Sequence, residues 1–155
     1  TTMRFSNGKT CMLFLASLGL MLFAAGGGAT AQRPPLPNPV LVYTAPEFFQ
    51  QGGKQWIRYR YNVDNFNVYP KEMFVAAPDL PPCGQNAKAS RTWVDIYEQS
   101  GKRLNGFCAF NSPDDLNKVW FALASDAIPP SWVYIELTDR KTNTKYKSAL
   151  AETTQ

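Results

Sequence analysis

Reactive side chains are few in this chain, and two cysteines are the first to consider. Cys83 lies in the stretch PDLPPCGQ, and Cys108 follows it in an apolar segment. A catalytic thiol needs a base to form thiolate, and the 155-residue sequence contains no histidine. The lack of histidine also argues against Ser-His-Asp catalysis and against histidine-ligated zinc. The role of the two cysteines therefore depends on the compartment in which the chain resides.

The first 31 residues have the organisation of a secretory signal peptide. Two basic residues precede an apolar run from 11 to 25, and small residues end the segment. Signal peptidase accepts only small side chains near the scissile bond, so Ala29 and Ala31 predict cleavage before Gln32. A membrane anchor is the weaker alternative, because the run is shorter than the roughly 20 residues of a membrane span. We predict an exported protein, periplasmic or extracellular, with no membrane span after signal removal.

Export would place the two cysteines in an oxidising compartment, where paired thiols form disulfides. We therefore predict a Cys83–Cys108 disulfide, with a free catalytic thiol as the weaker alternative. Closing a loop of this length would stabilise the fold by about 3 kcal/mol through the entropy of the unfolded chain. The bond would fasten the proline-rich loop that contains Cys83 to the strand that contains Cys108.

Length and charge limit the remaining possibilities. Removal of the signal peptide leaves 124 residues and takes away two of the 16 basic residues but none of the 12 acidic ones, so the net charge falls to +2. A nucleic-acid partner normally requires a concentrated basic face, and we predict none. A chain of this length is expected to form one domain with a real core.

The mature chain is predicted to begin with a proline-rich leader, QRPPLPNP, at 32–39. Proline lacks an amide proton and restricts the residue before it, so this segment should be extended. It is expected to act as a tether, although its PPLP also matches ligands of proline-reading modules. The leader should be followed by a domain at 40–150 and a short tail at 151–155.

Short runs of β-branched and aromatic residues alternate with turn clusters throughout the predicted domain. Hairpin turns are expected at 99–101 and around Asn143, where glycine or asparagine allows positive φ. The segment SPDDLNK predicts one short helical turn near 112–117, with Ser112 as its N-cap. Strands are expected near 40–44, 55–63, 72–76, 91–98, 103–110, 118–123, 132–139 and 144–150.

About seven or eight short strands without intervening helices predict an all-β, antiparallel β-sandwich. At the level of fold this pattern resembles the immunoglobulin and fibronectin type III group. The chain departs from antibody domains in one respect, because Trp93 follows Cys83 by only ten positions. The resemblance implies an architecture and no particular activity.

Alternation along the strands separates aliphatic residues from tryptophans, since successive side chains point to opposite faces of a sheet. If the aliphatic set forms the core, all four tryptophans lie on the opposite side, beside tyrosine, arginine and acidic residues. The alternative is that the leader, the 77–90 loop or strand bulges bury these tryptophans. The candidate binding residues are Trp56, Arg58, Trp93, Tyr97, Trp132 and Tyr134.

Such a mixture of side chains is typical of surfaces that bind sugars or proteins. We predict a non-catalytic binding module for an envelope protein or a glycan, without cofactor or metal. The alternatives are a carbohydrate-binding sandwich with an aromatic platform and a purely structural envelope protein. A pair of carboxylates for glycoside hydrolysis stays open, since 12 acidic residues are available. The basic hairpin formed by Arg140, Lys141, Lys145 and Lys147 would either touch anionic polymers or protect a sheet edge.

Overall fold

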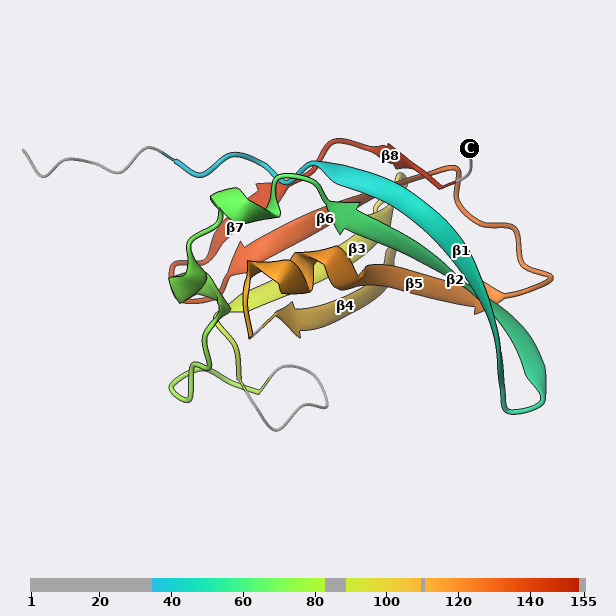
Figure 1. Ribbon diagram of the computed structural model, residues 1–155, viewed down its shortest axis with the longest axis horizontal. Coiled ribbons are helices and arrows are strands. Elements are labelled where there is room, and N and C mark those ends of the chain that lie inside the picture. The colour runs from blue at the N-terminus through green and yellow to red at the C-terminus, as the bar shows by residue number, and fades with distance from the viewer. Residues whose placement is uncertain (1–34, 83–88, 110, 154–155) are drawn as a thin grey trace, which may run out of the picture. The chain divides into compact units, whose positions relative to one another are not determined.

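The computed structural model describes residues 35–82, 89–109 and 111–153. The predicted signal peptide with Ala29, Ala31 and Gln32 lies outside these residues, as does Cys83. The described residues form eight strands and three 3-10 helices (Figure 1). The strands are β1 (Leu41–Gln51), β2 (Lys54–Val63), β3 (Thr92–Glu98), β4 (Arg103–Ala109), β5 (Val119–Ala124), β6 (Trp132–Asp139), β7 (Thr144–Lys147) and β8 (Ala151–Glu152). The 3-10 helices are η1 (Phe66–Val68), η2 (Lys71–Phe74) and η3 (Pro113–Lys118).

These strands form two antiparallel sheets packed face to face. One sheet has the order β1-β2-β5, and the other has the order β4-β3-β6-β7, with β8 also pairing with β6. The separation of β1, β2 and β5 from β3, β6 and β7 matches the immunoglobulin fold, and β4 extends the second sheet beside β3. The chain is thus an antiparallel, immunoglobulin-like β-sandwich, as the sequence predicted.

Alternate residues of the central strands form the core between the two sheets. Tyr61 and Phe121 come from the three-stranded sheet, and Val94 and Ile135 come from the five-stranded sheet, each at most 1% exposed. Their strand neighbours point away from the opposite sheet, and all four tryptophans belong to this outward set. Of the two arrangements that alternation left open, the structure has the aliphatic residues in the core and the tryptophans on the outward side.

Turn residues occur where the sequence placed the hairpins. Gly101 and Asn143 both have positive φ, at 90° and 56°. The helical turn is also confirmed as η3, because the Ser112 side chain accepts a hydrogen bond from the Asp114 amide. Residues without regular structure at 35–39 correspond to the end of the predicted leader.

The end of the leader is bound to the domain rather than hanging from it. Leu36 packs against the core, and the Tyr69 hydroxyl donates to the Pro37 carbonyl at 2.8 Å. Asn65 donates to the carbonyl of Asn38 at 3.0 Å. The extended leader therefore follows η1 along the domain for its last residues.

Three predicted strands differ from the structure. The strand expected at 72–76 is the 3-10 helix η2, in which the consecutive residues Met73 and Phe74 are both buried, a pattern that an alternating strand cannot produce. The strand expected to end at 44 continues to Gln51, because β1 is an edge strand and tolerates Pro46 there. The strand expected at 144–150 ends at Lys147 as β7, and residues 151–152, expected to belong to the tail, form β8 and pair with β6.

Candidate functional site

The six candidate binding residues lie on two different faces of the sandwich. Trp93, Tyr97, Trp132 and Tyr134 lie on β3 and β6, on the outer side of the five-stranded sheet. Trp56 and Arg58 lie on β2, on the outer side of the three-stranded sheet. The structure therefore brings four of the six together and separates them from the other two.

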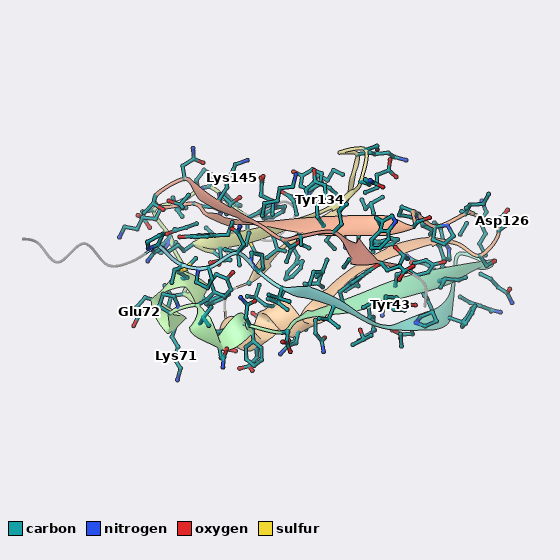
Figure 2. The ribbon with its side chains drawn as sticks, turned by 90° about the horizontal axis from the view of Figure 1, so that it is seen from above. Tyr43, Lys71, Glu72, Asp126, Tyr134 and Lys145 are labelled. Carbon is teal, nitrogen blue, oxygen red and sulfur yellow. The ribbon has the colours of Figure 1, made fainter. Side chains whose placement is uncertain are left out.

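We call the outer surface of the five-stranded sheet the ladder face. Its side chains come from four neighbouring strands, and Figure 2 shows Tyr134 and Lys145 on the side of this sheet turned away from the other sheet. The ladder face consists of Trp93, Asp95, Tyr97, Arg103, Trp132, Tyr134, Glu136, Lys145 and Lys147.

Two tyrosines form the centre of the ladder face. Tyr97 and Tyr134 are directly opposite in the β3–β6 register, and their rings stack with centroids 5.2 Å apart at an interplanar angle of 18°. The Lys147 ammonium lies 4.0 Å from the Tyr134 ring centroid. Lys147 comes from β7, which borders β6 on the side opposite β3. Both sides of the Tyr134 ring are thus occupied within the protein. Burial raises the pKa of Tyr97 first, and the nearby Asp95 and Glu136 carboxylates raise it further.

Two carboxylates face each other beside the tyrosines. Asp95 and Glu136 are register partners, and like charges in that position repel each other. Each has its own cation: Arg103 binds Asp95 at 2.5 Å, and Lys145 binds Glu136 at 2.7 Å. Both carboxylates are therefore paired with a cation. The hydrogen bond from Lys145 to Glu136 raises the pKa of Lys145.

Gly106 makes the Arg103–Asp95 pair possible. It lies directly opposite Asp95, and a Cβ atom at this position would clash with the Arg103 guanidinium and lie 2.5 Å from Asp95 Oδ1 and 2.9 Å from Trp93 Cζ2. Without a side chain there, Arg103 reaches across the strand to Asp95, and its guanidinium lies 5.7 Å from the Trp93 ring centroid.

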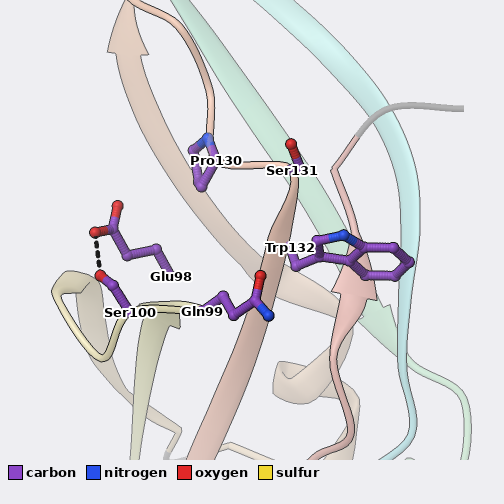
Figure 3. Close-up of a pocket in the computed structure, with 6 residues that line it drawn as sticks. All are labelled: Glu98, Gln99, Ser100, Pro130, Ser131 and Trp132. Atoms are coloured by element: carbon purple, nitrogen blue, oxygen red, sulfur yellow. Dashed lines mark hydrogen bonds between the residues drawn. The ribbon is translucent and has the colours of Figure 1, made fainter.

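Trp132 lies at the end of the ladder face and is 40% exposed. It borders a pocket of about 380 Å³ at the β3–β4 turn, opposite the loop that precedes β6 (Figure 3). In this pocket the Ser100 hydroxyl donates to the Glu98 carboxylate. The lining residues are Glu98, Gln99, Ser100, Pro130, Ser131 and Trp132.

We call the outer surface of the three-stranded sheet the arginine face. Its residues are Glu47, Phe49, Trp56, Arg58, Arg60 and Trp120. The Glu47 carboxylate accepts from Arg60 Nε at 2.7 Å and from Arg58 Nη1 at 3.1 Å, and the bond from Arg60 lowers the pKa of Glu47. The Arg58 guanidinium lies 4.5 Å from the Trp120 ring centroid and 4.9 Å from that of Phe49.

The arginine face contains more donors than acceptors. One carboxylate serves two guanidinium groups. In addition, Trp56 Nε1 and Arg58 Nε are buried without a hydrogen-bond partner among the described residues. A buried donor left unpaired costs about 1–3 kcal/mol, so these two groups lower the stability of the fold.

The predicted basic hairpin is largely occupied by contacts within the domain. Lys145 pairs with Glu136, and Lys147 packs on Tyr134. Arg140 donates to the carbonyl oxygens of Ser90 and Pro81 at 2.9 Å and 2.7 Å. These contacts favour a structural role for the hairpin over contact with anionic polymers.

Sequence reasoning missed several residues of both faces. Arg103 and Gly106 carried no local signal, because their role depends on the β3–β4 register. Arg60 followed Arg58 with the same alternation, so the β2 pattern could have identified it. Lys118 closes η3 beside Trp120, and only the folded chain brings it near Arg60.

The described residues include neither a candidate metal site nor a candidate membrane-spanning helix. No three acidic or cysteine side chains gather there in a way that could hold a metal ion. No helix within residues 35–82, 89–109 and 111–153 is long and apolar enough to cross a membrane.

No family model matches the chain, and no curated protein matches it significantly. Among solved structures, the chain is similar to a human pre-T cell receptor crystal structure, with 15% sequence identity and a TM-score of 0.41. The similarity covers 75% of this chain and 99% of that one. A likeness of this size carries no argument about function, and the assignment of the fold rests on the strand order described above.

Proposed function

We propose that this chain is an exported, non-catalytic interaction module that binds a protein partner through the ladder face. The observation that carries the proposal is the stacked Tyr97–Tyr134 pair on adjacent strands, flanked by Lys147. Tyrosine, tryptophan and arginine are the residues that most often dominate protein interfaces. Strands hold these side chains in place before binding, which lowers the entropic cost of association.

The stacking geometry favours a protein partner over a sugar at this face. A sugar platform requires an accessible ring face, because the C–H groups of the sugar pack flat on the ring. Tyr134 has Tyr97 on one side and Lys147 on the other. A protein partner can instead contact ring edges, hydroxyl groups and the rim of Asp95–Arg103 and Glu136–Lys145 ion pairs.

The Cys83–Cys108 disulfide belongs to the same proposal. Cys108 lies opposite Trp93 in the β3–β4 register, on the ladder-face side of β4. A bond to Cys83 would fasten the loop at the margin of the proposed interface. Mass spectrometry of the exported chain, alkylated with and without reduction, would show the bond as protection of both cysteines before reduction.

The proposal is tested by photocrosslinking in the organism that encodes the chain. A photoreactive residue replaces Thr138, on the outward side of β6, in the full-length chain, and the control carries it at Lys54 near the tip of the β1–β2 hairpin. We expect one discrete protein adduct from position 138 and none of that size from position 54. A second pair of variants keeps the photoreactive residue at position 138. Tyr134→Ala should abolish the adduct, whereas Val42→Ala on the other sheet should retain it.

The same experiment separates the alternatives. Equal adducts from both positions, or an adduct that survives Tyr134→Ala, would contradict the ladder face as the interface. A glycan bound by the wild-type chain and lost with Trp132→Ala would replace the protein partner by the carbohydrate-binding alternative. No adduct and no bound glycan would leave the structural envelope protein as the better description.

A further inference from the structure

A polar groove lies on the opposite side of the molecule from the ladder face. It has a volume of about 540 Å³ and runs between β2 and the junction of η3 with β5. Its wall combines two cations, two amides, a hydroxyl group and an indole ring. The residues that supply them are Thr44, Arg60, Asn62, Asn117, Lys118 and Trp120.

The two cations of the groove are held in place by carboxylates that do not line it. Arg60 Nε donates to Glu47 at 2.7 Å, and Lys118 Nζ binds Asp115 at 2.8 Å. Asp115 is itself fixed, because its side chain is 7% exposed and accepts from the Asn111 amide at 3.0 Å. Arginine has five N–H donors and lysine has three, so each cation keeps further donors beyond its printed bond. The side chains of Arg60 and Lys118 are 50% and 70% exposed, which leaves those donors accessible.

The lining residues include no carboxylate, so acceptor groups of a ligand would meet donors there. The neighbouring arginine face has the same imbalance, since Glu47 serves both Arg58 and Arg60. A ligand with several negative charges and oxygen acceptors would complement such a surface.

The neutral residues of the groove suit a polyhydroxylated ring. In the orientation that satisfies its neighbours, the Asn62 amide donates to the Asn117 carbonyl at 3.0 Å, which ties β2 to η3 beneath the groove. The Asn117 side chain also lines the groove, and its amide can both donate to and accept from hydroxyl groups. Trp120 has the Arg58 guanidinium 4.5 Å from its ring centroid and also lines the groove, where the ring can pack against apolar C–H surfaces.

We infer that this groove binds an acidic saccharide, whose carboxylates pair with Arg60 and Lys118 while a sugar ring packs beside Trp120. The site lies on the three-stranded sheet and shares no residue with the ladder face. The inference therefore stands or falls independently of the proposed protein interface.

The test measures the binding of two matched tetrasaccharides to the full-length chain by calorimetry at low salt. Cellotetraose is neutral, and the corresponding β-1,4-linked glucuronate tetramer differs from it only in the oxidation of C6. We expect the glucuronate tetramer to bind at least about tenfold more tightly than cellotetraose, because only the former provides carboxylates for the two cations. Inorganic phosphate, as a free anion without a ring, should bind more weakly than the tetramer.

Three variants of groove residues and one control variant assign the binding to the groove. Arg60→Gln and Lys118→Gln should each weaken binding of the glucuronate tetramer by about tenfold, whereas the matched charge removal Lys54→Gln should change it less than about twofold. Lys118→Gln lies outside the sheet and keeps a side-chain N–H donor for Asp115, so it remains informative if Arg60→Gln disturbs folding. Trp120→Leu should weaken the tetramer but leave phosphate unchanged.

Several results would overturn the inference. Equal affinity for the two tetrasaccharides, or no binding of either, would exclude an acidic saccharide. Phosphate bound as tightly as the glucuronate tetramer would reduce the groove to a general anion site without a saccharide ligand. Equal losses from Lys118→Gln and Lys54→Gln would show a diffuse charge effect and no defined site.

Discussion

The two outer faces of this sandwich use the same residue types in opposite ways. On the ladder face, Asp95 and Glu136 each have a cation of their own. On the arginine face, one carboxylate serves two guanidinium groups. The two buried side-chain N–H groups that lack a partner among the described residues both lie on the arginine face.

The difference follows from the number of strands on each side of the charged residues. In the five-stranded sheet, the acidic residues lie on the central strands β3 and β6, and the outer strands β4 and β7 supply a cation to each. In the three-stranded sheet, Arg58 and Arg60 lie on the central strand, but β5 places only Ala122 and Trp120 beside them. The two carboxylates of the ladder face are thus each paired with a cation of their own, whereas the arginine face has fewer carboxylates than cations.

The largest expected effect comes from a buried ion pair in the five-stranded sheet. Arg91 binds Asp139 through two hydrogen bonds of 2.7 Å and 2.6 Å, and the Asp139 side chain is 5% exposed. Arg91→Met would leave this carboxylate buried without its cation, which should lower the free energy of unfolding by about 3 kcal/mol. Glu47→Gln, which breaks the exposed pairs of the arginine face, should lower the free energy of unfolding far less, because solvent screens these charges. Urea unfolding followed by tryptophan fluorescence measures both, and equal losses would contradict the contrast.

Acid should remove the stability that the same ion pair contributes. Burial alone would raise the pKa of Asp139, but the hydrogen bonds from Arg91 and neighbouring groups outweigh burial and hold it below its ordinary value of 3.8. A lowered pKa means that the carboxylate stabilises the folded state fully above about pH 5 and loses this contribution as pH falls below about 4. Asp115 is shifted in the same direction, by hydrogen bonds from Lys118 and Asn111 that overcome its burial.

The sequence contains no histidine, so the free energy of unfolding should change little between pH 6 and 8 and decline below about pH 4. Unfolding experiments from pH 2 to 8 measure this dependence. Arg91→Met serves as the control, because without this ion pair the free energy of unfolding should decline less as the pH falls below about 4. A loss of stability that begins above pH 6 would contradict the assignment.

A smaller loss of stability is expected from a substitution within the ladder face. Gly106→Ala places a Cβ atom where the Arg103 guanidinium, Asp95 and Trp93 now meet, and crowding of this kind costs about 1–3 kcal/mol. The same substitution in an Arg103→Ala background should cost less, because the closest of the three groups is gone. Chemical unfolding of the wild-type chain, the two single variants and the double variant gives the coupling free energy between positions 103 and 106. Additive losses would mean that Gly106 is not needed for the pair.

Much of the fold could be predicted from local patterns. The glycine and asparagine of two hairpin turns, the cap at Ser112 and the alternation in β2, β3, β5 and β6 are local features, and each took the expected form. The strand expected at 72–76 failed because Met73 and Phe74 are both drawn into the core, which only the packed sheets require. The candidate site was predicted in part, since outward residues were recognised but were not divided between faces.

The sequence alone determined which side of each strand enters the core, because the period of two is set by the backbone of the strand. It could not determine which outer face a residue joins, since a sandwich has two and alternation does not distinguish them. Only the tertiary structure placed Tyr97 against Tyr134, and it alone separated both from Arg58. The physical reason is that strand order and register depend on contacts between residues far apart in the chain, whereas alternation depends only on neighbours.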